Sequence, residues 1–364
     1  MLHVSMPCSP KPTLDEVTHV GAMENCHMSA VSQAALQDFG ETVDRLCALD
    51  LRPAGPTSGY IGHFYTAVRA LTGAPLALTA AQCLYQSPAD STIVIATGFC
   101  HPQRLPHGET DGPPGAAALA RAILHGLKAT PWLLGEAAIA APLKACMQSL
   151  GVPVHGEPGA APAPGAIFQA FPTAALAAQE AASALIEQVQ PAAIIVTEKV
   201  GPNRLGVAHS AMGLAIPEGA RFPVEYLLDA AHAAGIPTIG VGDNGNDIGF
   251  GIIEDVVRRY KPYGDVCQCP CGGGLATVTK TTTLVTAAVA NWGAYGIVTC
   301  LAALCGQPDL LHSAVTELHM LEACVRAGAA DGITGQLEAT VDGLPAPVHA
   351  SIVELLHALL AKIM

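Results

Sequence analysis

Three short apolar runs, each followed by a polar loop and then by a helix-like segment, constrain the fold of this chain most strongly. Residues 91–97, 192–197 and 236–241 have the length and the apolar character of buried strands. Alanine-rich segments with helical spacing alternate with them. This repetition is typical of an α/β fold, a doubly wound and mainly parallel sheet with helices on both faces in a Rossmann-like three-layer arrangement. We therefore expect one α/β domain over residues 29–364, after a loose N-terminal segment at residues 1–28.

The longest apolar segment is expected to form a buried helix. A long helix is predicted from Thr282 to Cys305, with Asn291 and Trp292 deep inside it. Polar residues and glycines interrupt the segment, and no stretch reaches the roughly 18 uninterrupted apolar residues of a membrane span. We therefore expect no membrane partner. A subunit contact, which would make the protein a homo-oligomer, stays open as a second interpretation of this helix.

Composition narrows the classes of function. Of the 364 residues, 51% are hydrophobic and 13% are charged, which is enough to bury a large core. The net charge is -13, with only 17 Lys and Arg residues and no basic stripe, so nucleic acid is not an expected partner. The N-terminus lacks a basic start followed by an apolar core, and the 12 cysteines are scattered. Both features favour a reducing, cytoplasmic location.

A glycine-rich acidic loop at residues 239–251 follows the third apolar run. Its polar side chains are Asp243, Asn244, Asn246 and Asp247. The order of strand, loop and helix places them at the carboxyl end of a strand, where open α/β sheets bind ligands. An ordinary turn with helix-capping side chains is the alternative. The loop has neither a P-loop lysine nor the glycine spacing of a dinucleotide site, so no nucleotide cofactor is expected.

Two other strand ends carry similar polar loops. The first contains Glu109, Thr110 and Asp111, and the second contains Glu198, Lys199, Asn203, Arg204 and His209. The ends of parallel strands meet at one edge of the sheet, so we expect these loops and the acidic loop to form one small-molecule cleft. Each residue also has a structural interpretation: Asp111 as a helix cap, Lys199 as the partner of Glu198, and His209 as a surface histidine.

The closely spaced cysteines Cys267, Cys269 and Cys271 form a separate motif. Metal sites more often have two residues between paired cysteines, and no second pair lies nearby in the sequence. On a strand, this spacing would place the three sulfurs on one face. A structural role is favoured, and metal binding or redox chemistry stays open.

Four ordered motifs resemble the D-glutamate cyclase C-terminal domain family. They are the segments 109–120, 240–251 and 289–295, and the pair 331–335 and 341–344. The resemblance covers roughly residues 30–364 and implies a lyase that converts D-glutamate to 5-oxo-D-proline with loss of water. It is similar to a stand-alone bacterial form, since animal members are mitochondrial and carry a further N-terminal domain. Lys199 stands where animal members have an arginine.

This chemistry suggests roles for the loop residues. Cyclisation needs a base for the amine and a partner for carboxylate oxygens, so Asp243 or Glu198 is assigned to the amine, Lys199 to a carboxylate and His209 to proton transfer. The residues expected to bind substrate are Glu109, Thr110, Asp111, Asn203, Arg204, Asn244, Asn246 and Asn291, although Asn291 also fits a packing role. A divalent cation, Mg²⁺ or Mn²⁺, bound by Asp243, Asp247, Asp111 or Glu109, is an alternative way to polarise the carboxylate. Another enzyme, or a sensor, for a related carboxylated metabolite is the competing hypothesis.

Overall fold

A seven-stranded parallel sheet forms the centre of the protein in a computed structural model that describes residues 32–156 and 164–364. The strand order is β3-β4-β2-β1-β5-β6-β7. The strands are β1 (Thr92–Thr97), β2 (Thr130–Gly135), β3 (Val154–His155), β4 (Ala166–Ala170), β5 (Ala193–Thr197), β6 (Thr238–Gly242) and β7 (Thr283–Thr286). The described residues form one compact unit. The segment expected at residues 1–28 lies outside the described residues.

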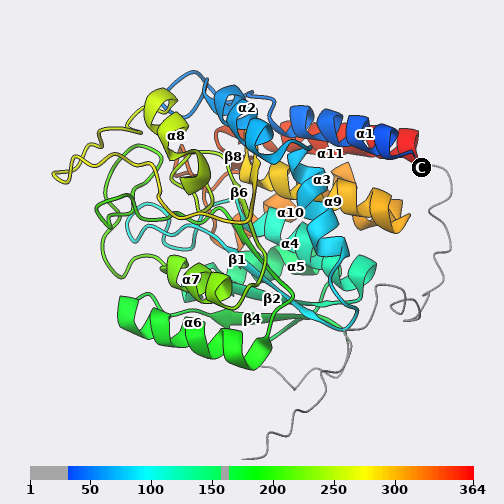
Figure 1. Cartoon of the computed structure of the whole chain (residues 1–364), viewed down its shortest axis with the longest axis horizontal. Helices are drawn as coiled ribbons and strands as arrows, with labels where there is room; N and C mark the ends of the chain where they lie inside the picture. The colour runs from blue at the N-terminus through cyan, green and yellow to red at the C-terminus, as the bar shows by residue number, and fades with distance from the viewer. Residues whose placement is uncertain (1–31, 157–163) are drawn as a thin grey trace, which may run out of the picture. The chain divides into compact units, whose positions relative to one another are not determined.

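Helices cover both faces of the sheet, which confirms the predicted three-layer α/β fold. Alternate residues of β1 point to opposite faces, so Ile93 and Ile95 belong to one core while Val94 and Ala96 belong to the other. The second core lies under α6 (Ala175–Val189) and α7 (Glu225–Ala233), which lie together on one side of the sheet in Figure 1. The first core is covered by α1 (Gln33–Cys47), α3 (Leu76–Tyr85), α4 (Pro113–Ala122), α5 (Ala140–Ser149), α9 (Ala290–Cys305), α10 (Ala314–Arg326) and α11 (Ala346–Ile363).

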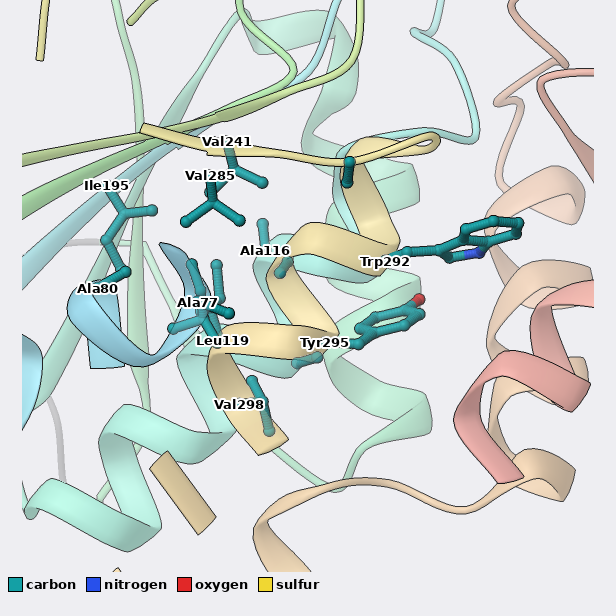
Figure 2. Close-up of a cluster of buried hydrophobic side chains, with 14 of the residues drawn as sticks. Ala77, Ala80, Ala116, Leu119, Ile195, Val241, Val285, Trp292, Tyr295 and Val298 are labelled. Carbon is teal, nitrogen blue, oxygen red and sulfur yellow. The ribbon is translucent and has the colours of Figure 1, made fainter. Parts of the chain in front are cut away.

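Helix α9 is the centre of the larger core. Figure 2 shows its side chains among those of α3 and α4, with Trp292 directed away from the sheet and toward α11. The Trp292 indole N–H donates to His349 Nδ1 at 2.9 Å. A Cβ on Gly293 would lie 2.8 Å from Val241 Cγ1, so glycine lets α9 approach the sheet closely.

The predicted start of this helix was wrong. Residues Thr283–Thr286 form strand β7, paired with β6, and the helix begins only at Ala290. Asn291 therefore lies in the first turn and not deep inside the helix. A short apolar run has the same pattern in a buried strand as in a buried helix, and only the pairing with β6 distinguishes them.

The remaining elements close the ends of the fold. They are α2 (Ile61–Thr72), α8 (Glu254–Tyr260) and a short antiparallel pair, β8 (Thr340–Val341) and β9 (Leu344–Pro345). Within the described ranges, α11 is the one helix long and apolar enough to cross a membrane, with a mean hydropathy of 1.3. Its Ile352, Val353 and Leu356 are buried in the main core, as expected for a core helix.

Candidate functional site

The three polar loops leave the sheet at one edge, as expected for parallel strands. Thr97 of β1 pairs with Thr197 of β5, and Thr197 pairs with Val241 of β6, so the three strands end side by side. The direction in which strands are added to the sheet also reverses between the neighbours β1 and β5. After β1 the chain adds β2 on one side of this pair, and after β5 it adds β6 on the other side. Ligands of open α/β sheets bind at such a switch point.

A cluster of buried carboxylates occupies this edge. Its members are Glu109, Asp111, Glu198, Asp243, Asp247 and Asp342, and each is at most 7% exposed. Carboxylate oxygens of Asp111, Asp243 and Asp342 lie within 4.8 Å of one another, as do those of Glu198, Asp243 and Asp247. Asp243 belongs to both groups and is therefore the centre of the cluster.

Arg52 is the cation that partners this cluster, and the sequence did not indicate it. Its Nη1 lies 2.5 Å from Asp243 Oδ2 and 3.7 Å from Asp342 Oδ2, with the guanidinium fully buried. Asn244 Nδ2 donates to the other oxygen of Asp243 at 2.5 Å, and the Tyr60 hydroxyl donates to Asn244 Oδ1 at 2.5 Å. Asp243 is therefore held from two sides by buried donors.

Burial and mutual repulsion disfavour full ionisation of these carboxylates. Burial raises the pKa of Asp243 to about 7, although Arg52 opposes this shift. Burial, followed by the charges of neighbouring acids, raises the pKa of Glu109, Glu198 and Asp342 well above the usual range. At neutral pH the cluster therefore retains protons or binds a cationic group in their place.

Glu198, a member of this cluster, is held in a strained backbone conformation. Its φ is +50°, in the left-handed region that residues with a side chain rarely adopt. Its Oε2 has no hydrogen-bond partner among the described residues. Strain of this kind is concentrated at functional sites. Gly112 (φ +99°) makes room for it, because a Cβ there would lie 3.0 Å from Glu198 Cβ.

A cavity of about 410 Å³ opens onto the cluster. This volume lies in the range of small-molecule pockets, about 300–1,000 Å³. Glu109, Glu198 and Asp342 provide its acidic lining, while His101 and Arg104 provide basic side chains. Further lining residues are Pro53, Phe99, Asn244, Asn246, Met212 and Ile216. The cavity thus presents both signs of charge to a small ligand.

A buried lysine that sequence reasoning did not single out lies close to the cluster. Lys261 Nζ donates to the carbonyls of Pro56 and Ala211 at 2.7 and 3.0 Å and lies 4.6 Å from the centre of the Tyr60 ring. Burial lowers the pKa of Lys261 to about 7, opposed by the charge of Asp243. This amine therefore exchanges its proton near neutral pH.

Several predicted ligands instead hold the site together. Asp111 accepts from the N–H groups of Ala290 and Asn291 at 2.8 Å and so caps α9, not the helix that directly follows it. Asn291 Oδ1 accepts from Gly112 and Gly115 at 3.0 and 2.8 Å.

The other residues in this group anchor the loops. Asp247 Oδ2 accepts from the N–H groups of Asp243 and Asn244, both at 3.0 Å. Thr110 Oγ1 donates to the Thr340 carbonyl at 2.7 Å. Asp247 Oδ1 has no hydrogen-bond partner among the described residues, whereas both oxygens of Asp243 accept from Arg52 and Asn244.

The basic residues of the second loop do not reach the cavity. Lys199 Nζ pairs with Glu136 at 2.5 Å and donates to the Gly98 carbonyl, so the expected pairing with Glu198 is wrong. The role of substrate-carboxylate ligand does not agree with this position either. Arg204 is half exposed and pairs with Glu254 at 2.9 Å. A lysine in place of arginine at position 199 therefore does not alter the cavity wall directly.

Asn203 and His209 also lie elsewhere than expected. Asn203 Nδ2 donates to the Gly274 carbonyl at 2.7 Å. The His209 ring is buried, with Nε2 at 3.2 Å from Cys269 Sγ and 3.6 Å from Cys271 Sγ. The roles of substrate ligand for Asn203 and proton shuttle for His209 do not agree with these positions.

The structure adds site residues that the sequence analysis did not name, and among Asp342, Arg52, Arg104 and Glu136 only the first had a usable sequence signal. Asp342 lies inside a quoted motif, at φ +53° in the turn between β8 and β9, so its motif could have identified it. Arg52, Arg104 and Glu136 stand in irregular segments without a distinguishing pattern. Their partners lie far away in the sequence.

The comparisons with known proteins identify the family of this chain. The family model described as D-glutamate cyclase-like, C-terminal, matches residues 57–357. The mitochondrial D-glutamate cyclase of Homo sapiens is 26% identical over 385 aligned positions, which cover 95% of this chain. The chain spans 56% of the length of that relative. Because the family model matches most of the chain and includes all three polar loops, the protein belongs to the D-glutamate cyclase-like C-terminal family.

Proposed function

We propose that this protein is a lyase that cyclises D-glutamate to 5-oxo-D-proline. The observation that carries the proposal is a buried carboxylate cluster, centred on Asp243, that opens into a cavity with basic residues on another part of its lining, in a chain of this family. The substrate has one ammonium and two carboxylates. Glu198 and its acidic neighbours suit the ammonium, while Arg104 and His101 suit a carboxylate.

The reaction forms one C–N bond and breaks one C–O bond. The amine nitrogen attacks the γ-carboxyl carbon, and one γ-oxygen leaves as water with two of the three ammonium protons. A base with a pKa near the working pH transfers protons most effectively, and Asp243, with its pKa of about 7, meets this condition. Holding the chain of the substrate folded would supply several kcal/mol of the barrier reduction.

The carboxylate cluster also fits a divalent cation. The two groups of three carboxylates that share Asp243 offer the oxygen donors that Mg²⁺ and Mn²⁺ prefer. Buried oxygens of Glu198, Asp247 and Asp342 lack hydrogen-bond partners among the described residues, so they are free to act as ligands. Such an ion would polarise the γ-carboxylate, while Arg52 keeps Asp243 in place.

A direct assay tests the proposed reaction. The purified chain is incubated with D-glutamate or L-glutamate, with and without Mn²⁺, and 5-oxoproline is measured by chiral chromatography. We expect the protein to form 5-oxoproline from D-glutamate faster than the uncatalysed reaction does. Heat-denatured protein should not show this excess of product. Binding of D-glutamate in a thermal-shift assay without any product would contradict a lyase and favour a sensor.

Divalent cations are expected to stabilise the protein in a pH-dependent way. The folded-state pKa of Asp243 is raised above its usual value of 3.8, so its contribution to stability is present at low pH and is lost as the pH rises through about 7. A bound ion replaces the protons, so Mn²⁺ should raise the unfolding midpoint more at about pH 8 than at about pH 5.5. At 100 times its Kd, Mn²⁺ would stabilise the fold by about 2.7 kcal/mol. Equal shifts at both pH values would contradict this prediction.

We propose a cytoplasmic location from the thiols of the chain. The described ranges contain free cysteines in α1, α3, α5, α9 and α10, several of them buried. Reduced thiols persist in the cytoplasm, which supports this proposal.

A further inference from the structure

A second group of potential metal ligands lies beside the carboxylate site and takes no part in the proposed reaction. It consists of His209 and the three cysteines Cys267, Cys269 and Cys271, whose ligand atoms all lie within 4.8 Å of one another. The cysteines lie in an irregular loop and not on a strand. They reach His209 from a segment more than fifty residues later in the chain. Folding, and not sequence proximity, therefore completes the set.

The four ligand atoms form a compact group, somewhat tighter than the tetrahedron of a filled zinc site. The three sulfurs form a nearly equilateral triangle with sides of 3.3, 3.3 and 3.4 Å. His209 Nε2 lies 3.2 Å from Cys269 Sγ and 3.6 Å from Cys271 Sγ. Zinc–sulfur bonds of about 2.3 Å in a tetrahedron imply sulfur–sulfur distances of about 3.8 Å. A disulfide would need about 2.05 Å and would leave the third cysteine unpaired.

The surroundings also favour a metal over a chance cluster. The His209 ring is fully buried, and among the described residues its ring nitrogens have only cysteine sulfurs at hydrogen-bonding distance. The Gly273 N–H and Asn203 Nδ2 approach Cys271 Sγ at 3.5 and 3.7 Å, as outer hydrogen bonds to a metal thiolate do. Three thiolates and one imidazole form a set that selects Zn²⁺ over hard ions such as Mg²⁺.

The loop geometry brings the cysteines together. Gly274 has φ +77°, and a Cβ there would lie 2.1 Å from the Gly264 carbonyl oxygen, so this turn requires glycine. Gln268 bonds the cysteine loop to the second polar loop, because its N–H donates to the Gly213 carbonyl at 2.9 Å and its Nε2 donates to the Met212 carbonyl at 2.7 Å. The two loops are therefore joined both at the cluster and beside it.

We propose that His209, Cys267, Cys269 and Cys271 bind a structural Zn²⁺ that fixes one wall of the cavity. The cavity lining includes residues 210–212 and 214–216, which directly follow His209. The His209 carbonyl also accepts from Asn246 Nδ2 at 2.9 Å, which connects the zinc ligand to the acidic loop. Four protein ligands leave no open position, as in structural zinc sites.

Metal analysis of tag-free protein, purified without chelators, tests the site. We expect about one zinc per chain in the wild type and less than a tenth of that in the double variant Cys269→Ser/Cys271→Ser. Cys83→Ser, at a half-buried free thiol of α3, is the matched control and should retain the zinc. A wild-type protein without zinc, or full zinc content in the double variant, would overturn the proposal.

Cobalt substitution keeps the test valid if the double variant does not fold. Wild-type protein produced with Co²⁺ should show the intense visible bands and the thiolate charge-transfer band of tetrahedral cobalt–thiolate sites. Asp243→Asn should leave this spectrum unchanged, because the carboxylate cluster supplies no ligand to it. A weak spectrum of oxygen-ligated cobalt, lost in Asp243→Asn, would place the metal in the carboxylate cluster and refute the cysteine site.

Discussion

Replacing Asp243 by asparagine is expected to lower turnover of D-glutamate by about 10²–10⁴-fold. Asparagine has nearly the same shape but neither accepts a proton nor binds a cation as a carboxylate does. Asp243 is the carboxylate shared by both groups of the cluster, and its raised pKa depends on burial. Steady-state kinetics would show the loss in kcat, because the role proposed for Asp243 is proton transfer at the reacting atoms.

The matched control for this substitution is Asp229→Asn. Asp229 is exposed on α7 and belongs neither to the carboxylate cluster nor to the cavity lining, so this substitution should leave kcat unchanged. Circular dichroism and the unfolding midpoint must show that Asp243→Asn is folded. Turnover within about threefold of wild type in a folded variant would refute the assigned role of Asp243.

Replacing Arg52 by alanine is expected to cost about 3–5 kcal/mol of unfolding free energy, because it leaves a buried carboxylate without its cation. The Arg52–Asp243 pair is completely buried, with 0% exposure of both side chains. Arg69→Ala is the control: Arg69 pairs with Glu41 at 27% and 25% exposure, and loss of such a surface pair costs about 0–1 kcal/mol. Urea unfolding measures the unfolding free energy of both variants. Equal costs for the two variants would contradict the proposed importance of burial.

The loss of unfolding free energy caused by Arg52→Ala should increase with pH. Burial raises the pKa of Asp243 above its value in the unfolded chain, and Arg52 lowers it, so without Arg52 the folded-state pKa rises further. Stability from a group with a raised folded pKa is present at low pH and is lost as the pH rises through that pKa. The unfolding free energy of the variant should therefore approach that of the wild type at about pH 5 and differ most from it at about pH 8. Arg52→Lys, which retains a positive charge, should weaken this pH dependence.

Local patterns predicted the larger elements well but missed some strands. The continuous apolar run 192–197 and the helical spacing of the alanine-rich stretch of α6 are clear local patterns, and both elements formed there. Strands β2 and β4 were not predicted, because a short strand that follows a helix or a Pro-rich stretch has little periodicity of its own. They are strands because β2 pairs with β1 and β4 pairs with β2.

The sequence alone determined the α/β fold class and the edge at which the polar loops meet, because strand length, alternation and loop composition are local properties. Only the tertiary structure decided which side chains enter the site. Arg52 and Asp342 join Asp243 from distant segments, while Lys199 and His209 turn away toward Glu136 and the cysteines. These choices depend on contacts between residues far apart in the chain, where burial requires each charge or polar group to find a partner.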